Sequence, residues 1–183
     1  MSSPNSPHPV FEVVVGDITK FAADVIVNSA HESLAPGGGV SRAIHRAAGP
    51  GLARDCAAIV DERGWLEAGE AAITVAYELP AKFVVHAVAP RYTDLGRGAH
   101  KPLSMAYQRT IELAIEARAK SIVFPSLGTG IFGFPIASAP AYAMDGLAVA
   151  SREGSTLKKV TICCFTEEDA VAYRAILNLR ETV

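Results

Sequence analysis

The chain has 183 residues, of which 50% are hydrophobic and 20% are charged, and its formal net charge at pH 7 is −2. This length and composition fit one domain with a buried hydrophobic core. The slightly negative charge disfavours a bulk electrostatic interaction with nucleic acid, although it is compatible with a local basic cleft.

The first nine residues, MSSPNSPHP, are rich in proline and serine. They predict a short disordered lead, followed by a single domain over residues 10–183. They have neither the basic start nor the apolar stretch of a signal peptide. No apolar run approaches the roughly 20 residues that a membrane-spanning helix needs, so we expect no contact with a membrane.

Six apolar runs have the length of β-strands, and several are continuous rather than alternating. Continuous runs are typical of strands that are covered on both faces. The runs are residues 10–15, 25–27, 71–77, 83–89, 121–125 and 160–165. The link between the third and fourth runs is too short for a crossover, so these two strands are predicted to form an antiparallel hairpin.

Helical spacing of apolar residues fills most of the gaps between these runs. We predict helices over residues 40–59, 104–119, 136–151 and 167–179, with Thr166 as the N-cap of the last helix. The alternation of strands and helices predicts an α/β fold, a three-layer α/β/α sandwich with a central mixed, mostly parallel six-stranded sheet.

The three cysteines are odd in number, and no pair has CxxC spacing. Cys163 and Cys164 lie in an apolar run, which predicts buried thiols and a reducing compartment, the cytoplasm. No group of histidines, cysteines and carboxylates has the sequence spacing of metal ligands, so we expect no metal and no cofactor.

Two glycine-rich loops follow predicted strands, at the edge where open α/β sheets bind ligands. Gly37, Gly38 and Gly39 directly precede a helix that opens at Val40. The free amides of a helix start favour an anion, most naturally a phosphate. A flexible turn is the alternative interpretation of the three glycines.

The second loop, SLGTGIFG over residues 126–133, also lies between a strand and a helix. Neither loop is a Walker A motif or a GxGxxG fingerprint. Together they predict a diphosphate held between them. Phe132 is either an exposed ring that stacks on a sugar or base, or ordinary core. Asp17, directly after the first strand, either accepts a hydrogen bond from a ligand amine or hydroxyl, or caps a turn.

In order and spacing, four segments resemble the macrodomain family. They are GDITKFAADVIVNSA, PGGGVSRAIHRAAG, GEAAITVAYELPAKFVVHAVAP and PSLGTGIFGFP. Macrodomains are three-layer modules that bind ADP-ribose, free or attached to proteins, and some hydrolyse its bond to a protein side chain or an acetyl group. The resemblance implies ADP-ribose or ADP-ribosylated proteins as partners, and we expect a monomer.

The resemblance also implies roles for individual residues. Asp17 would bond the adenine amine with Ile18 beside the ring, and Phe132 would pack on the terminal ribose. The first phosphate loop would comprise Gly37, Gly38, Gly39 and Val40, and Ser41, which follows it, is a further candidate for ligand binding. The second would comprise Ser126, Leu127, Gly128, Thr129, Gly130, Ile131 and Phe132. Asn28, Ala89 and Pro90 match strand ends beside the family's site.

Two departures from the family pattern concern catalysis. His31 replaces an asparagine that usually bonds the terminal ribose, and Ser41 replaces an aspartate of the MacroD-type hydrolases, whereas His45 is kept. A serine is not a general base at neutral pH. The catalytic candidates are therefore His45 and His31. A Ser41 nucleophile with His45 as base lacks an evident acidic partner, and a structural role for His45 is equally open. His86 is predicted to be a core histidine.

Three hypotheses follow. The first is a module that binds ADP-ribose, free or as mono- or poly(ADP-ribose) on proteins, with little or no turnover. The second is a hydrolase that removes ADP-ribose from acidic side chains or deacetylates O-acetyl-ADP-ribose. The third is an RNA or poly(ADP-ribose) binder that uses the same cleft, of which general RNA binding is disfavoured by the net charge.

Overall fold

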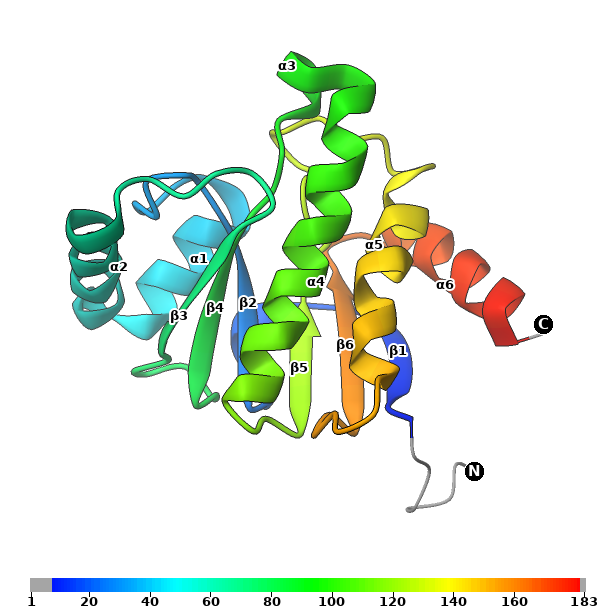
Figure 1. The fold of residues 1–183 in the computed structure, drawn as a ribbon, viewed down its shortest axis with the longest axis horizontal. Helices are drawn as coiled ribbons and strands as arrows, with labels where there is room; N and C mark the ends of the chain where they lie inside the picture. The colour runs from blue at the N-terminus through cyan, green and yellow to red at the C-terminus, as the bar shows by residue number, and fades with distance from the viewer. Residues whose placement is uncertain (1–7, 182–183) are drawn as a thin grey trace.

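The computed structural model describes residues 8–181, in which six strands form one sheet of order β1-β6-β5-β2-β4-β3 (Figure 1). The strands are Val10–Val15 (β1), Val25–Ala30 (β2), Ala71–Val75 (β3), Phe83–Val88 (β4), Ser121–Phe124 (β5) and Lys159–Cys164 (β6). β3 is antiparallel to β4, and the other neighbouring pairs are parallel. The predicted hairpin and the mixed, mostly parallel sheet are confirmed.

Helices cover both faces of this sheet. On one face lie α4 (His100–Glu116), α5 (Ala139–Leu147) and α6 (Glu167–Glu181), and on the other lie α1 (Gly39–Ala48) and α2 (Pro50–Arg63). Val25 and Val27 of β2 pack on the first face, and Ile26 packs on the second. The strands read as continuous apolar runs because both of their faces are buried. The three-layer sandwich is confirmed.

The single helix predicted over residues 40–59 is in fact two helices. The chain breaks at Gly49, whose φ is +82°, and α2 starts at Pro50. A proline disfavours helical backbone at the preceding residue and has no amide to donate, so it ends one helix and suits the first position of the next.

Other helix boundaries differ by a few residues. No helix is predicted between residues 89 and 104, but this segment folds into the short helix α3 (Tyr92–Leu95) and a 3-10 turn, Gly96–Ala99. α5 begins three residues later than predicted. Thr166 does cap α6, because its hydroxyl accepts the Asp169 amide at 3.2 Å. The predicted lead lies outside the described residues except for residues 8 and 9.

Among the described helices, none is long and apolar enough to cross a membrane. The three cysteines are free and buried, which confirms the predicted burial of Cys163 and Cys164. The placement in the cytoplasm and the monomeric state stay predictions.

Candidate functional site

A cleft of about 1080 Å³ lies beyond the carboxyl ends of the parallel strands. Its walls are residues 16–18 after β1, residues 35–41 before and within the first turn of α1, and residues 125–132 after β5 except Leu127. His31 after β2 and Phe165 after β6 add to them. The strand ends meet at this edge because the strands are parallel, so loops distant in sequence form one concave surface.

The first loop leaves the start of α1 open. Gly38 is the N-cap and has no side chain to bond the first-turn amides, and Gly39 has a φ of +52°. The buried Ser41 hydroxyl accepts the Gly37 amide at 3.3 Å and so ties the loop to the helix. The remaining first-turn amides have no intrahelical acceptor, which makes this end a seat for an anion.

The second loop, between β5 and α5, presents a further set of amides. The Phe134 amide donates to the Gly128 carbonyl and the Gly133 amide donates to the Gly130 carbonyl, both at 2.9 Å. Among the described residues, no acceptor takes the amides of residues 128–132. Gly128 has a φ of +79°, a conformation that glycine adopts without strain. The turn bonds thus use the carbonyls of Gly128 and Gly130 and leave the amides of residues 128–132 free to bind a ligand.

Asp17 and Phe165 emerge side by side at one end of the cleft, because Val15 of β1 pairs with Cys164 of β6. Asp17 Oδ1 accepts the hydroxyl of Thr19 at 2.7 Å and its amide at 3.0 Å. These bonds lower the pKa of Asp17, so the carboxylate is charged and Oδ2 can accept a further bond. Asp17 therefore caps a turn, as one of the two interpretations has it, and it also lines the cleft; its hydrogen bond to a ligand stays a prediction.

Sequence reasoning missed Phe165. Its side chain is 88% exposed although it is a large aromatic, and it lines the cleft beside Asp17. An exposed ring at a cleft wall offers a face for stacking on a base. The sequence analysis includes Phe165 in the apolar run 160–165, whereas β6 ends at Cys164.

His31 lies at the other end of the cleft, where β2 ends. Its Nδ1 accepts the Ser33 amide at 3.1 Å and lies 2.9 Å from the Ser33 hydroxyl. A backbone N–H can only donate, so Nδ1 carries no proton and the neutral ring carries its proton on Nε2. His31 therefore offers a ligand an Nε2–H donor.

Arg91 and Phe132 form the wall near His31. Phe132 is only 8% exposed, yet it lines the cleft, so it belongs both to the core and to the site. The guanidinium carbon of Arg91 lies 4.8 Å from the centre of the Phe132 ring, over its face. Among the described lining residues, Arg91 alone carries a permanent positive charge. Sequence reasoning had not identified it.

Five of the predicted site residues lie behind the cleft walls and do not line it. They are Asn28, His45, Ala89, Pro90 and Leu127, all buried. Within the described part of the chain, neither ring nitrogen of His45 has a hydrogen-bond partner, and both are inaccessible to solvent. The proposed Ser41–His45 pair is therefore not formed. The prediction that His45 acts in catalysis finds no support in this arrangement, because its ring does not reach the cleft.

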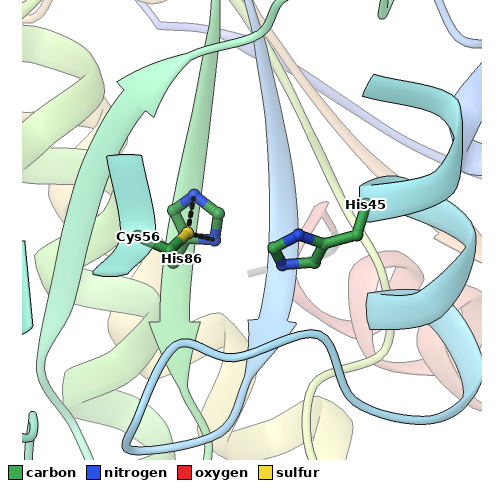
Figure 2. A group of neighbouring side chains, drawn as sticks. All are labelled: His45, Cys56 and His86. Atoms are coloured by element: carbon green, nitrogen blue, oxygen red, sulfur yellow. Dashed lines mark hydrogen bonds between the residues drawn. The ribbon is translucent and has the colours of Figure 1, made fainter. Parts of the chain in front are cut away.

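His45 belongs instead to a buried polar cluster with Cys56 and His86, shown in Figure 2. The ligand-type atoms of these three residues lie within 4.8 Å of one another, although they come from α1, α2 and β4. Both nitrogens of His86 are already engaged, Nδ1 with the Asn28 amide nitrogen at 3.1 Å and Nε2 with the Thr74 hydroxyl at 3.0 Å.

Within this cluster His86 and Cys56 are hydrogen-bonded, whereas buried His45 has no hydrogen-bond partner among the described residues. The cluster is not a preformed metal site, because His86 would have to give up a bond to become a ligand. Burial lowers the pKa of His86 to about 3 and raises the pKa of the Cys56 thiol to about 12. Burial also lowers the pKa of His45. The three side chains are thus neutral at pH 7, and the prediction that His86 is a satisfied core histidine is confirmed.

The pKa of His86 predicts an acid-sensitive fold. An unfolded histidine titrates near 6.5, so between pH 6.5 and about 3 the unfolded state binds a proton that folded His86 does not bind. We expect the free energy of unfolding to fall by up to about 1.4 kcal/mol per pH unit from this group as pH drops below 6.5. Urea unfolding at pH 7, 6 and 5 measures the slope.

His86→Gln is the matched variant, because an amide can keep polar contacts but does not titrate. Its slope between pH 7 and 5 should be shallower than that of the unaltered protein, with His45 contributing a remainder of the same sign. Equal slopes in the two proteins would contradict the placement of a neutral, fully buried His86.

Comparison with known proteins identifies the family. A family model described as Macro domain matches residues 27–143. The chain is 40% identical over 166 residues to the O-acetyl-ADP-ribose deacetylase of Klebsiella pneumoniae (strain 342), which covers 91% of this chain and 95% of that protein.

Solved structures agree with this match. A macrodomain mutant of Oceanobacillus iheyensis with ADPR has 36% identity and a TM-score of 0.87 over 93% of each chain. The Trypanosoma brucei macrodomain in complex with ADP-ribose has 31% identity and a TM-score of 0.82, over 96% of this chain and 72% of that one. Sequence and fold therefore agree over nearly the whole length, and the chain belongs to the macro domain family.

Proposed function

We propose that this protein binds ADP-ribose in the cleft, with the diphosphate between the two glycine-rich loops. The observation that carries the proposal is that two sets of free amides, one at the start of α1 and one over residues 128–132, line the same cleft. Backbone amides and a helix start bind phosphate without a cationic side chain. The names of the two solved relatives with bound ADP-ribose support the same ligand.

The adenine fits the end of the cleft at Asp17 and Phe165. An ionised carboxylate with a free oxygen suits the exocyclic amine of adenine, which is a donor. The exposed Phe165 ring gives the base a stacking partner. Ile18 lines the same end of the cleft and is almost fully buried, so its side chain offers the base an apolar contact.

The terminal ribose then lies toward His31, Phe132 and Arg91. A ribose hydroxyl accepts a hydrogen bond well, and His31 presents an Nε2–H donor, as the amide nitrogen of an asparagine would. His31 in this position acts as a donor. It cannot serve as a general base through Nδ1, which the Ser33 amide already occupies.

The second candidate function is hydrolysis of an ester on the terminal ribose. The name of the Klebsiella relative, O-acetyl-ADP-ribose deacetylase, favours it. The lining carboxylates, Asp17 and Asp169, follow β1 and β6, whereas His31 follows β2, which lies three strands from β1 and two strands from β6. Turnover would therefore depend on a water activated by the bound diphosphate rather than on a side-chain base near the ester. Binding stands first for this reason.

The binding proposal is tested by calorimetry with ADP-ribose and Phe165→Ala. Loss of base stacking should weaken binding about fivefold or more, since alanine substitution of a stacking aromatic costs roughly 1–3 kcal/mol per base. Val171→Ala removes another exposed apolar side chain, 57% exposed on α6 and outside the cleft lining, and should leave affinity unchanged. Absence of binding by the unaltered protein at millimolar ADP-ribose would refute the proposal.

The role of His31 is tested with two ligands that differ by the terminal ribose. His31→Ala should weaken ADP-ribose about threefold to tenfold, as for one neutral hydrogen bond, and leave ADP affinity unchanged. His31→Asn, which keeps a donor, should restore most of the loss. Equal effects of His31→Ala on both ligands would show that His31 does not contact the terminal ribose.

The second candidate is tested by following O-acetyl-ADP-ribose by NMR with the unaltered protein and Ser41→Asp. We expect slow or no release of acetate by the unaltered protein, because the described lining residues include no carboxylate at the ribose end. Ser41→Asp should leave the rate level or raise it. Rapid turnover by the unaltered protein would make hydrolysis the primary function.

A further inference from the structure

A line of buried hydroxyl groups runs from the core to the second loop. Tyr107 of α4 and Tyr173 of α6 are both fully buried, and their hydroxyl oxygens lie 3.0 Å apart. The Tyr173 hydroxyl lies 3.1 Å from the Ser126 hydroxyl, and Ser126 lines the cleft. At the other end, the Leu127 amide donates to the Tyr107 hydroxyl at 3.0 Å.

We propose that Tyr107 and Tyr173 are positioning residues that orient the Ser126 hydroxyl as a hydrogen-bond donor to the diphosphate. The inference rests on the proposed binding of ADP-ribose and assigns it two residues that do not touch the ligand. It does not concern the backbone amides of the two loops. It concerns the side-chain hydroxyl of Ser126, the first residue of the second loop.

The direction of the bonds follows from the donors available. The Leu127 amide must donate, so the Tyr107 oxygen accepts from it and the Tyr107 proton has only the Tyr173 oxygen within reach. Tyr173 then accepts from Tyr107 and must donate its own proton to Ser126, since a buried hydroxyl proton without an acceptor is costly.

The Ser126 oxygen therefore receives a bond from Tyr173. Its second bond is with the Thr129 hydroxyl, whose single proton has two acceptors within reach, the Ser126 hydroxyl oxygen at 2.8 Å and the Ser126 carbonyl at 3.1 Å. We assign the proton to the shorter contact, so the Ser126 hydroxyl oxygen accepts it. With both lone pairs of its oxygen taken, Ser126 keeps one free function, its own proton. Because Ser126 lines the cleft, that proton is available to an anionic ligand.

Both tyrosines hold their protons at neutral pH, which the arrangement requires. Burial raises the pKa of Tyr173 to about 12 and raises the pKa of Tyr107 well above its ordinary value. Hydrogen bonds in such a chain polarise one another, so donation from the core strengthens the donor at the cleft end. The line of buried hydroxyl groups also fixes the second loop to α4 and α6, on which the tyrosines lie.

The experiment is calorimetry of ADP-ribose and ADP on Tyr173→Phe, Ser126→Ala and the double variant. Each single variant should weaken both ligands about threefold to tenfold. The double variant should be no weaker than Ser126→Ala, because the two residues act through one hydroxyl. Binding of adenosine, which has no phosphate and is followed by NMR titration, should not change.

Tyr142→Phe is the matched control. It removes a tyrosine hydroxyl that forms a hydrogen bond with His100 Nδ1 at 2.9 Å. Tyr142 stacks on His100 and does not belong to the line of buried hydroxyl groups. It should leave the affinity for ADP-ribose unchanged, and urea unfolding of all variants separates loss of stability from loss of affinity.

Three results would overturn the inference. They are unchanged binding by Tyr173→Phe, additive losses in the double variant, and an equal loss for adenosine, which would mark a general structural effect. If the unaltered protein binds none of the phosphate ligands, the proposed function falls, and the inference falls with it. If the unaltered protein binds ADP-ribose and Tyr173→Phe binds it with unchanged affinity, the proposed function is retained and the inference about the tyrosines is refuted.

Discussion

Backbone amides left free at one edge of a parallel sheet are the feature on which the candidate site depends. Strands β1, β2, β5 and β6 end at the same edge, and two of the loops that follow them expose amides rather than side chains. A phosphate can be held there by neutral donors and a helix dipole. This explains how a chain with a net charge of −2 can offer an anion site whose lining includes one permanent cation, Arg91.

The two loops are held in place by different means. The first is tied to its own helix by the Ser41 hydroxyl, which accepts the Gly37 amide. The second is tied to the core by the tyrosine hydroxyls of α4 and α6. Rigid supports of this kind reduce the entropy that a flexible glycine loop would lose on binding. The glycines thus supply exposed amides, and neighbouring hydroxyls supply the order.

Local sequence signals predicted the sheet and the loops. Continuous apolar runs identified all six strands, and the glycine clusters at 37–39 and 128–133 identified the two loops. The break at Gly49 was missed because apolar spacing continues across it, although Gly49-Pro50 was a visible signal. The burial of His45 could not be read from its spacing to Ser41, because its environment is set by α2 and β4.

Contacts between distant segments account for the remaining differences. Phe165 lies beside Asp17 in the cleft because β6 pairs with β1. Arg91 lines the cleft with its guanidinium group over the Phe132 ring. The His45, Cys56 and His86 group unites three elements with no common sequence spacing. Such groupings depend on strand order and helix packing, which residue patterns along one chain do not specify.

A crystal structure of the protein with ADP-ribose tests the central claim most directly. The account predicts a diphosphate within hydrogen-bond distance of amides from both residues 38–41 and residues 128–132, with the base beside Asp17 and Phe165. A ligand whose phosphates contact only one loop, or that lies outside the cleft, would contradict it.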